Sequence, residues 1–238
     1  YEWSTGTSQS TPAGTGASAV IVEYYKEKYG VKPSPAMVKS LMINAAEPID
    51  YNDDGTIESI PNKYVGWGNI NLVPICDPDV KVMNIDQKSL LETGQTDTYD
   101  IAYYDSNKPM KITLTWTDKE AGSGDNPALK NDLDLEITAP NGDVYRGNAF
   151  VNGYTPSGAN TMSDFDLDDD GDDDTNVVEN IFIPPGELQT GTYSVKIIGE
   201  DVPADANNDG IANQDYALTM YNANNLSDDG IVNIEKDI

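Results

Sequence analysis

The stretch Lys111-Ile112-Thr113-Leu114-Thr115-Trp116 alternates polar and apolar side chains. Successive side chains of a β-strand point to opposite faces of a sheet, so this alternation predicts a strand with one buried face. The pattern recurs in residues 132–137, 193–197 and 215–220, and turn signals such as Pro140-Asn141-Gly142 lie between these segments. Short alternating strands without intervening helices predict an antiparallel β-sandwich from about residue 78 onward.

The residues before this sandwich follow a helical pattern. Apolar side chains recur at helical spacing over residues 12–29, and Gly30 is a suitable stop. Ser34-Pro35 combines a favoured N-cap residue with a proline suited to a first helical turn. This pair predicts a second helix that begins there, with Val38, Leu41, Met42 and Ala45 on one face. The predicted fold class is therefore mainly β, with an antiparallel sandwich preceded by two helices.

The composition limits the class of protein. Of 238 residues, 14 are Lys or Arg and 41 are Asp or Glu, which gives a formal net charge of −27. This charge would repel a nucleic acid and attract metal cations. Apolar residues make up 38% of the chain, which is enough for a buried core, and no stretch approaches the ~20 apolar residues of a membrane span. We therefore expect neither a nucleic-acid partner nor a membrane span.

The candidate catalytic feature is a stretch of small and polar residues, Gly6-Thr7-Ser8-Gln9-Ser10-Thr11-Pro12. Because proline suits the first turn of a helix, Ser8 is expected just before or at the start of the first helix. Backbone N–H groups point outward there and favour negative charge, which suits a serine whose attack on a carbonyl creates an oxyanion. The alternative is a serine-rich loop that only caps the helix.

This stretch resembles the nucleophile motif of the subtilisin-like serine proteases (subtilases), which is usually Gly-Thr-Ser-Met-Ala-Ser/Thr-Pro. Gln9 and Ser10 replace the usual Met and Ala, and the remaining positions agree. The resemblance implies that Ser8 is the nucleophile and that its own backbone N–H is one oxyanion-hole donor.

A subtilase also needs a histidine as general base and an aspartate that orients it, and this chain contains no histidine. In that family both residues precede the serine, and only seven residues precede Ser8 here. The resemblance therefore implies the C-terminal part of a secreted, calcium-stabilised serine endopeptidase, extracellular or at the cell surface, that acts on a protein or peptide substrate. We expect the chain to be inactive without an N-terminal catalytic fragment that carries the Asp and His.

The resemblance also divides the chain. Gly66-Trp67-Gly68-Asn69-Ile70-Asn71 is similar to the segment that closes the subtilase catalytic domain, so residues 1–77 are expected to be the end of that domain, with two helices and a short terminal strand. Such helices are normally buried against a parallel sheet. Because that sheet is missing here, we expect apolar side chains such as Ile21 and Leu41 to be exposed unless the missing part is bound.

Residues 78–223 resemble the jelly-roll domain that follows the catalytic domain in some secreted subtilases and is similar in style to the P-domain of proprotein convertases. The order of several short segments carries this resemblance: Leu114-x-Trp116-x-Asp118, Asn131-Asp132-Leu133-Asp134-Leu135, Asn176-Val177-Val178-Glu179-Asn180 and Gly191-Thr192-Tyr193. Residues 224–238 are interpreted as an acidic tail or as the start of a further segment.

Aspartates are concentrated in residues 164–174, where eight of eleven residues are Asp. Asp166-x-Asp168-x-Asp170-Gly171 matches the first half of a calcium loop and Asp172 adds a carboxylate, but Val177 replaces the bidentate Glu at position twelve. Like charges at this density repel one another unless a cation lies among them. These four aspartates are candidate Ca²⁺ ligands, and the alternative is a solvated acidic loop.

A second candidate calcium loop is Asp205-x-Asn207-x-Asp209-Gly210, with Asp215 further along the chain. Weaker versions of the pattern begin at Asp50 and Asn225. Asp-Gly and Asn-Gly also form ordinary tight turns, so these matches do not by themselves establish a metal site.

The strand predicted over residues 132–137 carries two aspartates. Asp132 and Asp134 lie two residues apart and share one face, whereas Leu133 and Leu135 take the other. We expect the leucines to face the core and the aspartates to face solvent, where they either keep an outer strand soluble or contribute to a metal site.

Two classes of function remain. The leading interpretation is the protease part described above, in which the β-domain stabilises the protease, binds substrate or attaches the protein to a surface. The alternative is a non-enzymatic, calcium-binding adhesion or scaffold protein derived from a subtilase. A second polypeptide with the catalytic Asp and His, or labelling of Ser8 by a fluorophosphonate, would favour the protease.

Overall fold

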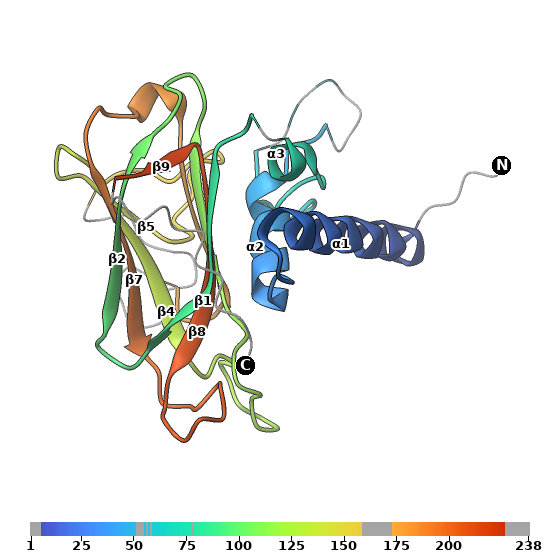
Figure 1. The fold of residues 1–238 in the computed structure, drawn as a ribbon, viewed down its shortest axis with the longest axis vertical. Helices are drawn as coiled ribbons and strands as arrows, with labels where there is room; N and C mark the ends of the chain where they lie inside the picture. The colour runs from blue at the N-terminus through green and yellow to red at the C-terminus, as the bar shows by residue number, and fades with distance from the viewer. Residues whose placement is uncertain are drawn as a thin grey trace.

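In a computed structural model, the described part of the chain forms a β-sandwich with helices on one side (Figure 1). The structure describes residues 6–50, 55, 57, 59–77, 79–158 and 173–226, apart from the side chain of Lys88. The helices are α1 (Thr7–Tyr29), α2 (Pro35–Ala45) and α3 (Val73–Cys76). The strands are β1 (Val82–Leu91), β2 (Thr96–Tyr103), β3 (Met110–Thr115), β4 (Asp132–Thr138), β5 (Val144–Arg146), β6 (Val178–Ile183), β7 (Tyr193–Asp201), β8 (Gln214–Tyr221) and β9 (Ala223–Asn225).

The strand order of the two sheets is that of a jelly roll. The four-stranded sheet has the order β1-β8-β3-β6, and the five-stranded sheet has the order β5-β4-β7-β2-β9. Strand β1 thus pairs with β8, β2 with β7, β3 with β6 and β4 with β5, and each pair is antiparallel. The predicted antiparallel jelly-roll sandwich is confirmed. Each of the four alternating segments recognised in the sequence lies largely within one strand: β3, β4, β7 or β8.

The core lies between the two sheets and contains the apolar half of each alternating strand. Ile112 and Leu114 of β3, and Leu135 and Ile137 of β4, belong to one cluster in which each is at most 1% exposed. Burying an apolar side chain of this size contributes roughly 1.5–3 kcal/mol. Alternation of side chains on both sheets therefore produces the sandwich.

Local sequence signals set the limits of the helices. Gly30 follows α1 in the left-handed conformation, with a φ of 81°, and its N–H donates to the carbonyl of Lys26 at 2.9 Å. The hydroxyl of Ser34 caps α2 by accepting the N–H of Met37 at 2.9 Å. Both signals were predicted. However, α1 begins at Thr7, earlier than predicted, so Pro12 lies inside the helix and not at its first position.

Helix α2 packs against the outer face of the four-stranded sheet, and α1 and α3 pack against α2 (Figure 1). The expectation that Ile21 and Leu41 lack a covering sheet is therefore wrong, since they are 0% and 2% exposed. Helix α2 contacts β3 and β8, and the Ser40 hydroxyl donates to the Thr113 carbonyl at 2.9 Å. The sandwich itself supplies a sheet for the helices.

Two local expectations are also corrected. Residues 66–71 form no strand, although they lie within the described range 59–77, and Asn69 makes only an isolated bridge to Glu47. Asp132 and Asp134 do not face solvent, because they are only 8% and 3% exposed. Alternation shows which residues share a face of a strand, but it does not show what covers that face.

Candidate functional site

Ser8 lies in the first turn of α1, as the sequence predicts. Gly6 is the N-cap, and its carbonyl accepts the N–H groups of Gln9 at 3.1 Å and Ser10 at 3.2 Å. The φ of Gly6 is 142°, a value that residues with a side chain rarely adopt. The N–H groups of Thr7 and Ser8 precede the first intrahelical bonds, so they point out of the helix end. Together with the helix dipole, they favour negative charge beside Ser8.

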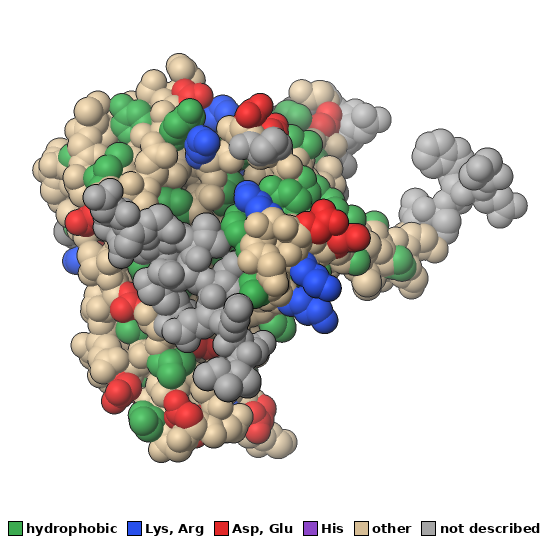
Figure 2. Space-filling model, viewed as in Figure 1, with side chains coloured by type: hydrophobic (Ala, Val, Ile, Leu, Met, Phe, Trp, Pro, Cys, Tyr) green, Lys and Arg blue, Asp and Glu red, His purple; other side chains and the backbone are tan. Residues whose placement is uncertain are grey.

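The surroundings of Ser8 are open. Helix α1 extends away from the sandwich (Figure 1), and its far end shows neither acidic nor basic side chains in Figure 2. Residues 6–16 are exposed, apart from half-buried Gly14. Because the sequence contains no histidine, this chain brings no imidazole base to Ser8. The helix end thus offers a hydroxyl and oxyanion donors without a histidine base.

Three of the predicted calcium ligands share one loop between β7 and β8. The Asp205 carboxylate accepts the N–H groups of Gly210 at 2.9 Å and Asp209 at 3.2 Å, and these bonds lower the pKa of Asp205. The Asn213 amide donates to Asp209 at 2.9 Å and accepts from Asn207 at 2.9 Å. The oxygen-rich side chains of the predicted loop are therefore brought together.

Asp215 lies apart from that hydrogen-bonded loop. Its carboxylate on β8 accepts hydrogen bonds from Gln87 and Gln214, and burial raises its pKa. In the described ranges, no group of three or more His, Cys, Asp or Glu side chains is placed to hold a metal ion. Outside those ranges lie the other predicted ligands, Asp166, Asp168, Asp170 and Asp172. Calcium binding stays a prediction.

Strand β6 carries a carboxylate whose burial was not predicted from the sequence. Glu179 is fully buried, and its Oε2 atom accepts the N–H of Leu135 on β4 at 2.5 Å. Its Oε1 atom is buried without a hydrogen-bond partner. Burial raises the pKa of Glu179 well above its usual value, and the nearby carboxylates of Asp134, Asp173 and Asp132 raise it further. Glu179 is therefore held in its neutral, protonated form over a wider pH range than an exposed glutamate.

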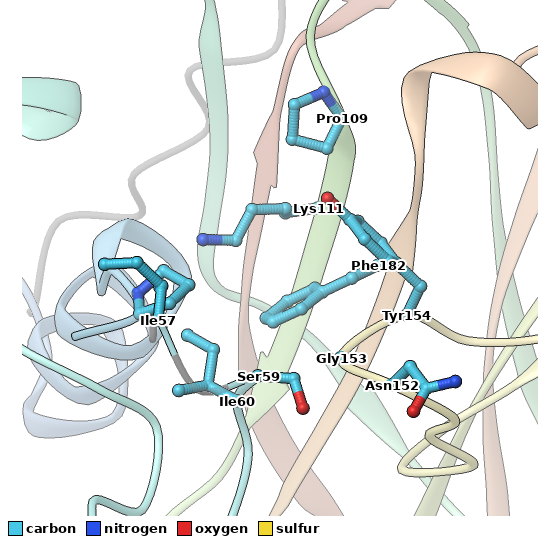
Figure 3. Close-up of a pocket in the computed structure, with 10 residues that line it drawn as sticks. Ile57, Ser59, Ile60, Pro109, Lys111, Asn152, Gly153, Tyr154 and Phe182 are labelled. Carbon is cyan, nitrogen blue, oxygen red and sulfur yellow. The ribbon is translucent and has the colours of Figure 1, made fainter. Parts of the chain in front are cut away.

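A pocket of about 250 Å³ lies between the segment that follows α2, at Pro48 and Ile60, and the sandwich (Figure 3). Lys111 of β3 reaches into it, and its ammonium donates to the carbonyl of Ala46 at 3.1 Å and lies 4.8 Å from the centre of the Phe182 ring. Burial lowers the pKa of Lys111 to about 8. Ala46 is the C-cap of α2, so the ammonium lies at the negative end of that helix. Through these contacts, Lys111 links the C-terminal end of α2 to the sheet, which is a structural role.

Comparison with known proteins connects the chain to large proteins with protease names. No family model matches it. It is 29% identical over 236 residues to the serine protease/ABC transporter B family protein tagA of Dictyostelium discoideum, which covers 90% of this chain and 12% of that protein. It is 22% identical over 271 residues to tagD, a protein of the same description and organism, with 92% and 14% covered.

The chain thus spans only about an eighth of the length of these relatives. No helix in the described part of the chain is long and apolar enough to cross a membrane. The similarity to two proteins named as serine proteases supports a protease-related origin for this chain.

Proposed function

We propose that this chain is the C-terminal part of a secreted, calcium-stabilised serine endopeptidase of the subtilisin-like type. The observation that carries the proposal is the position of Ser8 at the exposed N-terminal turn of α1, within Gly-Thr-Ser-x-x-Thr-Pro. The serine-protease names of the two much longer relatives support it. A segment upstream of Ser8 in the longer protein supplies the Asp and His.

In this proposal, the Ser8 hydroxyl attacks the scissile carbonyl while the upstream histidine takes its proton. The outward N–H of Ser8 stabilises the oxyanion, and the peptide amine leaves with the proton that the histidine returns. Water then hydrolyses the acyl-enzyme. The sandwich is an accessory domain in this scheme, and its contacts to α2 support the helix that carries Ser8.

Calcium has a structural role in the proposal. Asp205, Asn207 and Asp209 would hold one ion, because Ca²⁺ prefers carboxylate and amide oxygens. Because the loop offers only two carboxylates, it would bind Ca²⁺ weakly, with water or backbone carbonyls as the remaining ligands. The ion would hold the side chains of the loop between β7 and β8 together and would offset part of the net charge of −27.

The test compares this chain with the longer natural protein. Peptide hydrolysis and fluorophosphonate labelling of Ser8 are expected only in the longer protein, because the base lies upstream. Ser8→Ala should abolish both, whereas Thr15→Ala, two turns further along α1, should retain both. Hydrolysis that persists in the Ser8→Ala variant would remove Ser8 as nucleophile. A longer protein that binds calcium but is neither labelled nor active would favour the adhesion or scaffold alternative.

A further inference from the structure

We propose that a cleft between the helices and the sandwich binds an apolar carboxylate of the size of a peptide's C-terminal residue. The cleft, here called the lysine cleft, has a volume of about 720 Å³, within the range of roughly 300–1,000 Å³ that is typical of ligand pockets. Its lining includes Lys39, Ile43, Lys63, Trp67, Phe150 and Val177. Neither the Ser8 turn nor the Asp205 loop contributes to it, so the inference does not depend on the proposed function.

Aromatic rings form an apolar wall beside the lysine cleft. The rings of Trp67 and Phe150 have centroids 5.8 Å apart at 67°, in an edge-to-face arrangement. Phe182 lies behind them, 5.3 Å from Phe150 and 6.4 Å from Trp67. Because these rings come from segments far apart in the sequence and hold one another in place, the wall is preformed. It suits the aromatic or aliphatic side chain of a ligand.

The lysine cleft concentrates positive charge in a strongly acidic protein. Lys39 on α2 and Lys63 both line it, although the whole chain has 14 basic and 41 acidic residues. The Lys63 ammonium lies 5.1 Å from the centre of the Tyr64 ring. No hydrogen bond or ion pair joins the Lys39 ammonium to another group, as far as its described surroundings extend. Burial lowers the pKa of Lys39. A half-buried cation without a partner favours an anionic ligand.

The amide groups of the cleft are already engaged. The side-chain Oδ1 atom of Asn62 accepts the N–H groups of Tyr64 and Val65. The side-chain amides of Asn148 and Asn176 donate to Asp173. A ligand with many hydroxyls would therefore find few free partners. A ligand with one carboxylate and one apolar group matches what remains, and the C-terminal residue of a peptide and a free aromatic acid share this chemistry.

Calorimetric titration of the 238-residue chain tests the proposal with N-acetyl-glycyl-phenylalanine, its C-terminal amide and phenylacetate. The amide should bind about five-fold more weakly than the acid, the factor that corresponds to ~1 kcal/mol for a partly exposed ion pair. Tighter binding of the peptide acid than of phenylacetate would identify a peptide C-terminus as the source of the carboxylate, and the reverse order would identify a free acid. Equal binding of acid and amide, or no binding, would overturn the proposal.

Variants locate the site. Lys39→Met keeps the apolar stem of the side chain, and we expect it to weaken binding of the peptide acid about five-fold. Lys26→Met on exposed α1 makes the same change in net charge outside the cleft and should leave binding unchanged. In two-dimensional NMR spectra the ligand should shift the indole N–H signal of Trp67. Equal effects of the two lysine substitutions, or an unshifted Trp67 signal, would contradict binding in the lysine cleft.

Discussion

Asn44 of α2 donates from its Nδ2 atom to the hydroxyl oxygen of Thr113 on β3 at 3.0 Å, and this bond joins the helices to the sandwich. The same amide donates to the carbonyls of Lys111 at 3.0 Å and Thr219 at 3.3 Å. The Thr113 hydroxyl in turn donates to Asn180 of β6 at 2.7 Å. This network is buried beneath α2, so the helices and the sheet stabilise each other.

Removing the Asn44 amide should destabilise the whole chain. Asn44→Ala leaves the carbonyls of Lys111 and Thr219 buried without this donor, at an expected cost of about 1–3 kcal/mol in the free energy of unfolding. Urea denaturation followed by circular dichroism measures this cost. The exposed substitution Asn69→Ala should change stability by less than ~0.5 kcal/mol. Equal stability of the two variants would show that the network contributes nothing.

The sandwich could be predicted from the sequence because alternation and burial are linked within each strand. The alternation predicts Ile112 and Leu114 as core residues, and both are buried in the core. The contact between helices and sheet could not be predicted, because Thr113 and Thr219 read as solvent-facing residues. They are buried because α2 covers them and supplies hydrogen-bond partners.

Local parts of the candidate site were also predictable. Ser8 was correctly predicted at a helix start, although Pro12, on which that prediction depended, lies inside α1. The Asp-Gly turn gathers the loop that begins at Asp205. The burial of Glu179 was not predicted, because the sequence suggested this residue only as a substitute for the missing glutamate of the calcium loop. Its spacing of two and four residues from buried Ile181 and Ile183 was the available signal for an inward position.

The pH dependence of stability should report the protonation of Glu179. The pKa of Glu179 is higher in the folded state than in the unfolded state. Its contribution to the free energy of unfolding is therefore fully present below the unfolded pKa and is lost as the pH rises through the folded pKa. Glu179→Gln stays neutral and keeps the shape of the side chain. Relative to the variant, the natural chain should therefore lose stability as the pH rises above the range in which an exposed glutamate titrates.

Urea denaturation across this pH series measures that difference. Because titration of the whole acidic chain also changes stability with pH, Glu120→Gln at an exposed position is the matched control for a lost charge. The control should follow the natural chain at every pH. If Glu179→Gln also follows it, Glu179 is ionised in the folded protein at the start of the series.

The backbone at Gly147 lies very close to the Glu179 side chain, and this contact leads to a third prediction. A Cβ atom added at Gly147 would lie 2.1 Å from Oε2 and 2.7 Å from Cδ of Glu179. The fully buried glutamate is fixed by its bond to Leu135, so Gly147→Ala should destabilise the protein by about 1–3 kcal/mol. Gly186→Ala meets nothing within 4 Å and is the control.

A double-mutant cycle identifies the cause of this loss. In a Glu179→Ala background the added methyl group no longer meets the carboxylate, so Gly147→Ala should cost less than it does in the natural chain. Thermal denaturation of the four proteins gives the coupling free energy. Strict additivity of the two substitutions would show that Gly147→Ala acts through the backbone and not through Glu179.

Calcium should raise the melting temperature if the loop that begins at Asp205 holds an ion. Extracellular calcium modules bind with dissociation constants of about 10⁻⁴–10⁻³ M. At ten times such a constant, one occupied site raises the melting temperature of a chain of this size by roughly 3–6 °C. Asp209→Asn keeps the shape of the loop, removes one carboxylate and should reduce this increment. Asp143→Asn, in the turn between β4 and β5, should retain it.

Screening of charge must be separated from binding, because a chain with a net charge of −27 is stabilised by any salt that weakens its self-repulsion. Sodium chloride at matched ionic strength screens charge without filling a site. Magnesium holds its water more tightly and demands stricter geometry, so it should restore less stability than calcium after treatment with EDTA. Differential scanning calorimetry should therefore rank calcium above magnesium and magnesium above sodium. Equal effects of sodium and calcium at matched ionic strength would mean that the aspartates are a solvated acidic surface.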